Sequence, residues 1–103
     1  MVKYEAVMLY VINLLQAIFD TSNRVEQNED FYESVDKING LYEEHKNFVQ
    51  TCNEESFRMM IYYLRCFKNL SLQDKKEEDV LIIDELIKYT EKVYQEGKGA
   101  MKP

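Results

Sequence analysis

The stretch that decides the fold is residues 56–70, which read SFRMMIYYLRCFKNL. Wound as an α-helix at about 100° per residue, this stretch spreads apolar side chains over an arc of roughly 220°, against ~100° for an ordinary surface helix. Its polar line is narrow and consists of Arg58, Tyr62, Arg65 and Asn69. A bundle core needs only one side of such a helix, so something else has to cover the second apolar side.

The rest of the chain also favours helices. It has 103 residues, the size of one domain, with only three Gly and one Pro. Its net charge of -6 repels phosphate backbones, so no direct nucleic-acid binding is expected. A basic or neutral protein surface is the better partner for a chain of this overall charge.

The most apolar stretch is residues 6–19, AVMLYVINLLQAIF. Its 14 residues are fewer than the ~20 that cross a bilayer, so we expect a helix surrounded by protein and no membrane span. Glu5 beside Lys3 does not fit the basic start of a signal peptide. Cys52 and Cys66 are expected roughly 18 Å apart, as free thiols. Together these features predict an intracellular protein, cytoplasmic or nuclear.

Local signals predict four helices, over residues 2–20, 29–52, 54–70 and 72–96. Asn28 and Asn53 are suitable N-caps, residues 71–74 (SLQD) resemble a capping box, and Gly97 is a suitable C-cap. Residues 21–28 are polar and aperiodic, which is typical of a loop. The prediction is an all-α, antiparallel (up-down) four-helix bundle, with a single domain over 1–97 and a flexible tail over 98–103.

The second predicted helix contains a turn-like dipeptide, Asn39-Gly40. The apolar stripe crosses this dipeptide in phase, which a chain reversal would scramble, so we expect one continuous helix. Its stripe repeats in threes and fours, as in helices packed at shallow angles, and consists of Phe31, Val35, Ile38, Tyr42, His45, Val49 and Cys52.

His45 is the only histidine, and it lies on this apolar stripe. A di-iron bundle would need Glu-x-x-His, but position 42 is Tyr, so a structural histidine is the preferred interpretation. The chain has no Cys-x-x-Cys pair, phosphate-binding Gly loop or Gly-x-Ser-x-Gly elbow. We therefore expect no enzymatic activity, cofactor or metal. An enzyme built around His45 remains the alternative.

The helix over 54–70 carries two apolar sets. The first set, which includes Met60 and Leu64, faces the core. The second set is expected to anchor a partner through Met59, Tyr63, Cys66 and Leu70, while Arg58, Tyr62 and Arg65 set the polar register. This pattern predicts a non-enzymatic protein–protein interaction module, an adaptor, assembly subunit or inhibitor, that binds another protein or a second copy of itself.

Two other interpretations stay open at this point. The helix over 2–20 could cross the helix over 54–70 and cover both apolar sets, which gives a compact monomer. Alternatively, the apolar helices could line an internal pocket, which makes the protein a small-molecule or lipid carrier.

Three short pieces resemble the helical domain of GINS replication-complex subunits. They are NEDFY (residues 28–32), LYEEH (residues 41–45) and FRMMIYYLR (residues 57–65). The spacing of the first two pieces differs by one residue, the third helix is short, and no second small β domain follows. The resemblance implies a helical scaffold subunit in a DNA-replication complex as one form of the interaction hypothesis.

Overall fold

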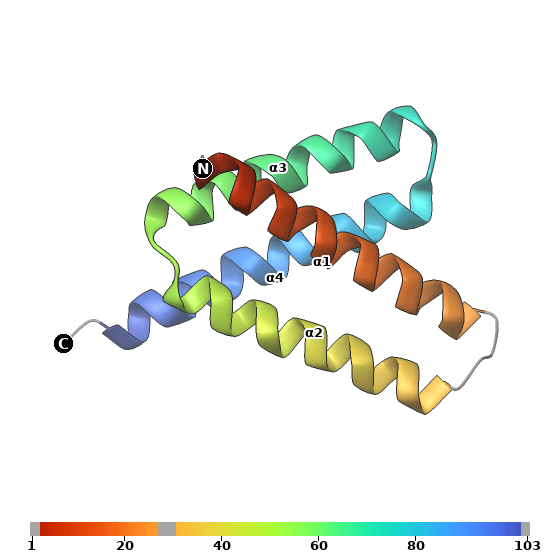
Figure 1. Ribbon diagram of the computed structural model, residues 1–103, viewed down its shortest axis with the longest axis horizontal. Helices are drawn as coiled ribbons and strands as arrows, with labels where there is room; N and C mark the ends of the chain where they lie inside the picture. The colour runs from red at the N-terminus through yellow and green to blue at the C-terminus, as the bar shows by residue number, and fades with distance from the viewer. Residues whose placement is uncertain (1–2, 27–30, 102–103) are drawn as a thin grey trace.

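The computed structural model describes residues 3–26 and 31–101, and this part of the chain contains helices and no strands. The helices are α1 (Lys3–Glu26), α2 (Phe31–Thr51), α3 (Glu54–Gln73) and α4 (Glu77–Met101). Successive helices run in opposite directions, so α1 and α3 point one way while α2 and α4 point the other way (Figure 1). The predicted all-α, up-down four-helix bundle is confirmed.

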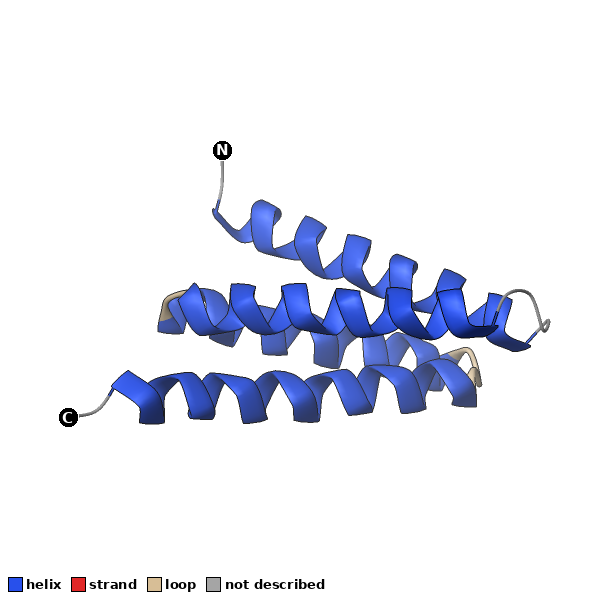
Figure 2. Cartoon of the chain, turned by 90° about the horizontal axis from the view of Figure 1, so that it is seen from below, coloured by secondary structure: helices blue, strands red, loops and turns tan. Residues whose placement is uncertain are grey.

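In cross-section the bundle is a diamond. α1 packs against α2 and α3, and α4 packs against the same two helices. α1 and α4 therefore form the two outer layers, with α2 and α3 between them (Figure 2). α2 and α3 lie across the diamond from each other, although only Cys52 and Asn53 separate them in the chain.

One hydrophobic core joins all four helices. Each helix contributes side chains three or four residues apart, because that spacing places them on one side of an α-helix. Met60, Leu64 and Leu86 are 0% exposed. The full set of buried apolar residues is Val7, Val11, Leu14, Leu15, Ile18, Val49, Met59, Met60, Ile61, Leu64, Ile83, Leu86, Ile87, Val93 and Tyr94.

α1 is buried on one side only, which corrects the expectation that protein surrounds it. Leu9 is 55% exposed and Tyr4 is 50% exposed, whereas Val11 is 1% exposed. The reason is the place of α1 in the diamond. A helix in an outer layer that packs against two others keeps its far side in water, however apolar its sequence is.

α1 also continues past the predicted end at residue 20, so the predicted loop over residues 21–28 is wrong as far as Glu26. The segment is polar, but it holds no Gly or Pro that would stop a helix. Thr21 is 1% exposed, and its hydroxyl donates to the Ala17 carbonyl at 2.8 Å, which satisfies this polar group inside the helix. The predicted N-cap Asn28 lies outside the described residues.

The junction of α3 and α4 differs most from the prediction. Residues 71–74 are not a capping box that starts α4, because α3 continues to Gln73 and α4 begins at Glu77. The Lys76 N–H donates to the Ser71 carbonyl at 2.9 Å, and the Lys75 N–H donates to the Leu72 carbonyl at 3.1 Å. Lys75 has a positive φ of 59°. These features define a Schellman motif that ends α3.

The other predicted helix signals have mixed outcomes. Asn53 is the N-cap of α3, since its side chain accepts from the Ser56 N–H at 2.8 Å. α2 runs unbroken through Asn39 and Gly40, as predicted. Gly97 is not a C-cap, because α4 passes through it to Met101. The predicted tail over 98–103 is thus helical as far as residue 101, and residues 102–103 lie outside the described part.

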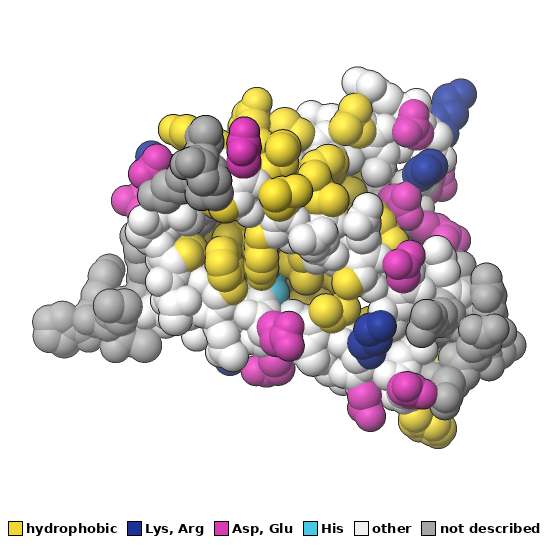
Figure 3. All heavy atoms as spheres, in the orientation of Figure 1, with side chains coloured by type: hydrophobic (Ala, Val, Ile, Leu, Met, Phe, Trp, Pro, Cys, Tyr) yellow, Lys and Arg dark blue, Asp and Glu magenta, His cyan; other side chains and the backbone are white. Residues whose placement is uncertain are grey.

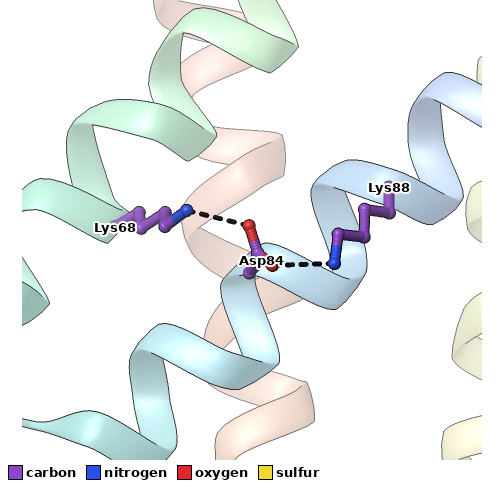
Figure 4. Close-up of polar contacts among 3 residues, drawn as sticks. All are labelled: Lys68, Asp84 and Lys88. Atoms are coloured by element: carbon purple, nitrogen blue, oxygen red, sulfur yellow. Dashed lines mark hydrogen bonds and ion pairs between the residues drawn. The ribbon is translucent and has the colours of Figure 1, made fainter.

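One ion-pair cluster links α3 to α4 on the surface. Asp84 accepts from Lys68 at 2.8 Å across the two helices and from Lys88 at 3.2 Å along α4 (Figure 4). Hydrogen bonds from Lys68 and then Lys88 hold the pKa of the Asp84 carboxyl below its ordinary value. Lys68 is therefore already engaged within the chain.

Candidate functional site

The residues predicted to bind a partner, both the apolar anchors and the polar line that includes Tyr62, all lie on α3, and the structure gives them different exposures. Tyr62 is 64% exposed and Leu70 is 53% exposed. Tyr63 and Cys66 are half-buried. We call the surface formed by these four residues the α3 edge. Tyr62, Cys66 and Leu70 follow one another at intervals of four residues and so form a continuous strip, and a contiguous exposed apolar surface is a common mark of a binding site.

Met59 differs from the other predicted anchors. It is 9% exposed and belongs to the core, so its assignment to an exposed apolar set is corrected. The physical reason is that α1 packs on α3 and covers much of this side of the helix. The covering is incomplete, since Leu70 remains exposed. The second apolar side of α3 is therefore partly covered by α1, which is intermediate between the two predicted alternatives of full burial and full exposure.

The two arginines of the polar line are both exposed on α3. The Arg58 guanidinium pairs with the Glu54 carboxylate at 2.9 Å, and both side chains are more than half exposed. Such a solvated pair adds little stability. Arg65 makes no hydrogen bond or ion pair with any described residue. Its guanidinium is thus available to a carboxylate from outside the chain.

A hollow of about 310 Å³ adjoins the α3 edge between α1, α3 and α4. Leu70 belongs to both surfaces, so the edge leads directly into the hollow. The sequence analysis missed this hollow, because its lining comes from three helices whose relative placement no local pattern specifies. The apolar part of the lining is Ile12, Leu15, Phe19, Phe67, Leu70 and Ile83.

The space-filling view shows how apolar side chains gather on this side of the molecule. They spread over α1, over the part of α3 beside it and into the space between α1 and α2, and the acidic side chains lie mostly around their border (Figure 3). A second hollow of about 450 Å³ lies at the turn between α3 and α4. Its lining includes Leu72 and Leu81, which are 53% and 66% exposed, together with Lys75 and Lys76.

His45 lies at the floor of a third hollow, of about 370 Å³, between α1 and α2, where its side chain is just visible (Figure 3). The imidazole is 1% exposed. Its Nδ1 atom lies 2.7 Å from the Tyr10 hydroxyl, and its Nε2 atom lies 2.7 Å from Thr90 Oγ1. His45 thus joins α1, α2 and α4 through two hydrogen bonds.

The hydrogen-bond partners determine which imidazole nitrogen carries the proton. The Thr90 hydroxyl donates its only hydrogen to the Leu86 carbonyl at 2.7 Å. Thr90 Oγ1 must therefore accept from His45 Nε2–H, and Nδ1 accepts from the Tyr10 hydroxyl. Both nitrogens are satisfied with the imidazole neutral.

Burial sets the protonation state of this cluster. It lowers the pKa of His45 from the ordinary 6.5 to about 4, so the imidazole is neutral at pH 7. It also raises the pKa of the Tyr10 hydroxyl well above its ordinary range. A general base needs an accessible lone pair near a substrate, whereas both His45 nitrogens are occupied by protein groups. This geometry matches the structural role predicted for His45.

The two cysteines are both free and half-buried. The Cys52 thiol donates to the Val49 carbonyl at 3.1 Å, and burial raises its pKa. A raised pKa lowers the thiolate fraction and therefore the reactivity of this thiol.

Within residues 3–26 and 31–101, no three or more His, Cys, Asp or Glu side chains are grouped so that they could hold a metal ion. In the same described part of the chain, no helix is both long enough and apolar enough to cross a bilayer.

No protein-family model matches the chain, and searches of curated proteins and of solved structures gave no match either. The resemblance to GINS subunits thus rests on the three sequence pieces alone.

Proposed function

We propose that this protein is a non-enzymatic interaction module that binds a helix of another protein along the α3 edge. The observation that carries the proposal is the exposure of Tyr62 and Leu70 on one helix, beside the half-buried Tyr63 and Cys66. Aromatic and Arg side chains are enriched at the centres of protein interfaces, and the α3 edge contains Tyr62 and Tyr63.

The hollow next to Leu70 supports docking of a side chain. Its volume of about 310 Å³ is at the small end of the range for ligand pockets, and it is open to solvent. A large apolar side chain from a partner helix would enter it and be covered by α1, α3 and α4. Adaptor, assembly subunit and inhibitor are all forms of this function, and a scaffold subunit like those of GINS is one of them.

The experiment compares two matched substitutions in the full-length chain. Leu70 and Leu72 are both 53% exposed near the end of α3, but two positions apart they point to different sides of the helix. Leu70→Gln should weaken binding of a copurifying polypeptide by about tenfold or more, whereas Leu72→Gln should change it by less than about twofold. Quantitative mass spectrometry after affinity isolation from native cells measures both effects.

Circular dichroism provides the control for folding, because both variants should keep the helical spectrum of the parent. Equal retention of every copurifying polypeptide by the two variants would count against the α3 edge. The rival function, a small-molecule or lipid carrier, predicts a copurifying small ligand in native mass spectrometry instead.

A further inference from the structure

The hollow between α1, α3 and α4 has an apolar floor and an acidic mouth. Leu15 and Ile83 line its floor and are 4% and 1% exposed. Asp74 is exposed and Asp79 is half-buried, so these two lining residues lie nearer to solvent. Neither carboxylate makes a hydrogen bond or ion pair with any described residue. Both are therefore open to a cation from outside the chain.

The other lining residues do not balance these two carboxylates. Lys76 is the only cation among the described residues of the lining, and its remaining polar members, Gln16 and Ser71, are neutral. A neighbouring hollow of about 300 Å³ shares Asp79 and adds the acid Glu78. The hollow at the turn between α3 and α4 shares Lys76 and adds one cation and one acid, which leaves the net charge unchanged. Apolar surface with this acidic surround favours an apolar group that carries a cation beside it.

The acidic mouth continues the apolar strip of the α3 edge. The row runs along α3 at intervals of four residues through Tyr62, Cys66, Leu70 and Asp74. Asp74 is the C-cap residue, and its backbone N–H donates to the Leu70 carbonyl at 3.0 Å, as in the helix before it. Arg65 lies about 140° around α3 from Leu70, so it belongs to another side of the helix. The charge that adjoins the strip at the hollow is thus the carboxylate of Asp74.

We propose that the partner segment bound at the α3 edge is a basic amphipathic helix. A large apolar side chain of this segment enters the hollow beside Leu70, and a Lys or Arg one turn away in the segment pairs with Asp74 or Asp79. The spacing follows from the row, because the four residues from Leu70 to Asp74 rise by about 6 Å. This inference rests on the proposed function and adds the chemistry of the partner.

Charge argues against a second copy as the occupant. In a two-fold symmetric dimer, the same surface of both copies forms the interface. A dimer through the hollow would therefore bring Asp74 and Asp79 of both copies together, and like charges in one interface are unfavourable. Each copy would also bring its net charge of -6.

Two labelled synthetic peptides of about 20 residues test the partner chemistry by fluorescence anisotropy. Both carry the same leucine stripe at helical spacing, flanked by Lys in the basic peptide and by Gln in the neutral peptide. The full-length protein should bind the basic peptide about tenfold more tightly than the neutral one at low salt. Added salt should reduce this difference, because it screens exposed charges.

Paired variants separate the effect of the two carboxylates from that of the overall charge. Asp74→Asn combined with Asp79→Asn should weaken binding of the basic peptide by about fivefold or more. The same variant should bind the neutral peptide within about twofold of the parent, which also shows that it is folded. The matched control combines Glu91→Gln with Glu96→Gln, at exposed positions about 18 Å or more along α4 from Asp79. It makes the same change in net charge and should alter either affinity by less than about twofold.

The outcomes separate this inference from the function on which it rests. Leu70→Gln should weaken both peptides. Equal weakening of the basic peptide by the two double variants would show that only the overall charge acts, which would overturn the inference but leave docking at the α3 edge in place. Binding of neither peptide, or binding that Leu70→Gln leaves unchanged, would overturn both. A dimer by sedimentation that dissociates on Leu70→Gln would overturn the inference, because the occupant would be a second copy.

Discussion

The Nε2 atom of His45 and the Oγ1 atom of Thr90 lie 2.7 Å apart across the interface of α2 and α4. Both groups are buried, with exposed fractions of 1% and 0%. Since the Thr90 hydroxyl donates to Leu86, the histidine is the donor of this bond. The contact fixes the neutral tautomer and leaves Nδ1 to accept from Tyr10 on α1.

The buried histidine predicts that the protein loses stability in mild acid. The pKa of His45 is about 4 in the folded chain and near the ordinary 6.5 in the unfolded chain, so the unfolded state binds the proton more tightly. The contribution of the neutral His45 to the free energy of unfolding is complete above about pH 6.5. It is lost as the pH falls toward about 4, and the total loss is about 3 kcal/mol. Urea unfolding at several pH values measures this change.

The control for the acid effect is His45→Gln, which cannot take up the proton. The free energy of unfolding of this variant should fall less between about pH 6.5 and about pH 4.5 than that of the parent. Parallel curves for the two proteins would show that other groups, such as the carboxyl of Asp84, cause the acid sensitivity.

The two hydrogen bonds of His45 should contribute different amounts to the free energy of unfolding. Thr90→Val leaves the Nε2–H without a partner in a fully buried place, and it should cost about 2 kcal/mol. Tyr10→Phe should cost about 1 kcal/mol, because Tyr10 is only half-buried and water can reach Nδ1 more easily. Tyr4→Phe, at an exposed tyrosine on α1, is the control and should be near neutral. Equal losses for Thr90→Val and Tyr4→Phe would contradict the assigned network.

The left-handed residue at the end of α3 predicts a stabilising substitution. Lys75 has a φ of 59°, a region where a side chain adds strain and glycine does not. Lys75→Gly should therefore raise the free energy of unfolding by about 1 kcal/mol. Lys76→Gly, one residue further along and outside this region, should not stabilise the protein. Thermal or urea unfolding distinguishes the two variants.

Two glycines within helices give a second matched pair. A Cβ at Gly40 would meet nothing within 4 Å, so Gly40→Ala should stabilise α2 by about 1 kcal/mol. A Cβ at Gly97 would lie 3.0 Å from Gln50 Cγ, where α4 approaches α2 closely. Gly97→Ala should gain less or lose stability, because the Gln50 side chain has to move. An equal gain at both sites, measured by urea unfolding, would show that this approach is loose.

The local sequence predicted some helix ends correctly and others incorrectly, for identifiable reasons. Asn53 was recognised as an N-cap because its role depends only on the N–H of Ser56, three residues away. Residues 71–74 were assigned to the wrong helix because Ser and Asp suit a helix start, while the Schellman motif depends on the backbone of Lys75. Gly97 was taken as a helix end, but its lack of a side chain serves the packing of α4 against α2 instead.

The candidate site was partly predictable in the same way. The periodicity of α3 predicted a second apolar side that includes Leu70 and a polar line that includes Tyr62, and both residues are exposed, but it also placed Met59 outside the core. The hollow beside Leu70 could not be predicted, because side chains from α1, α3 and α4 form it together.

The sequence by itself determined that this protein is four helices, since capping residues and the three-four spacing of apolar side chains act over one or two helical turns. It also determined that α1 and α3 carry more apolar surface than a bundle core requires. Only the tertiary structure decided how that surplus is divided. Packing α1 against both α2 and α3 buries Met59 and leaves Leu70 and Leu9 in solvent, because burial depends on which helices are neighbours and no single helix contains that information.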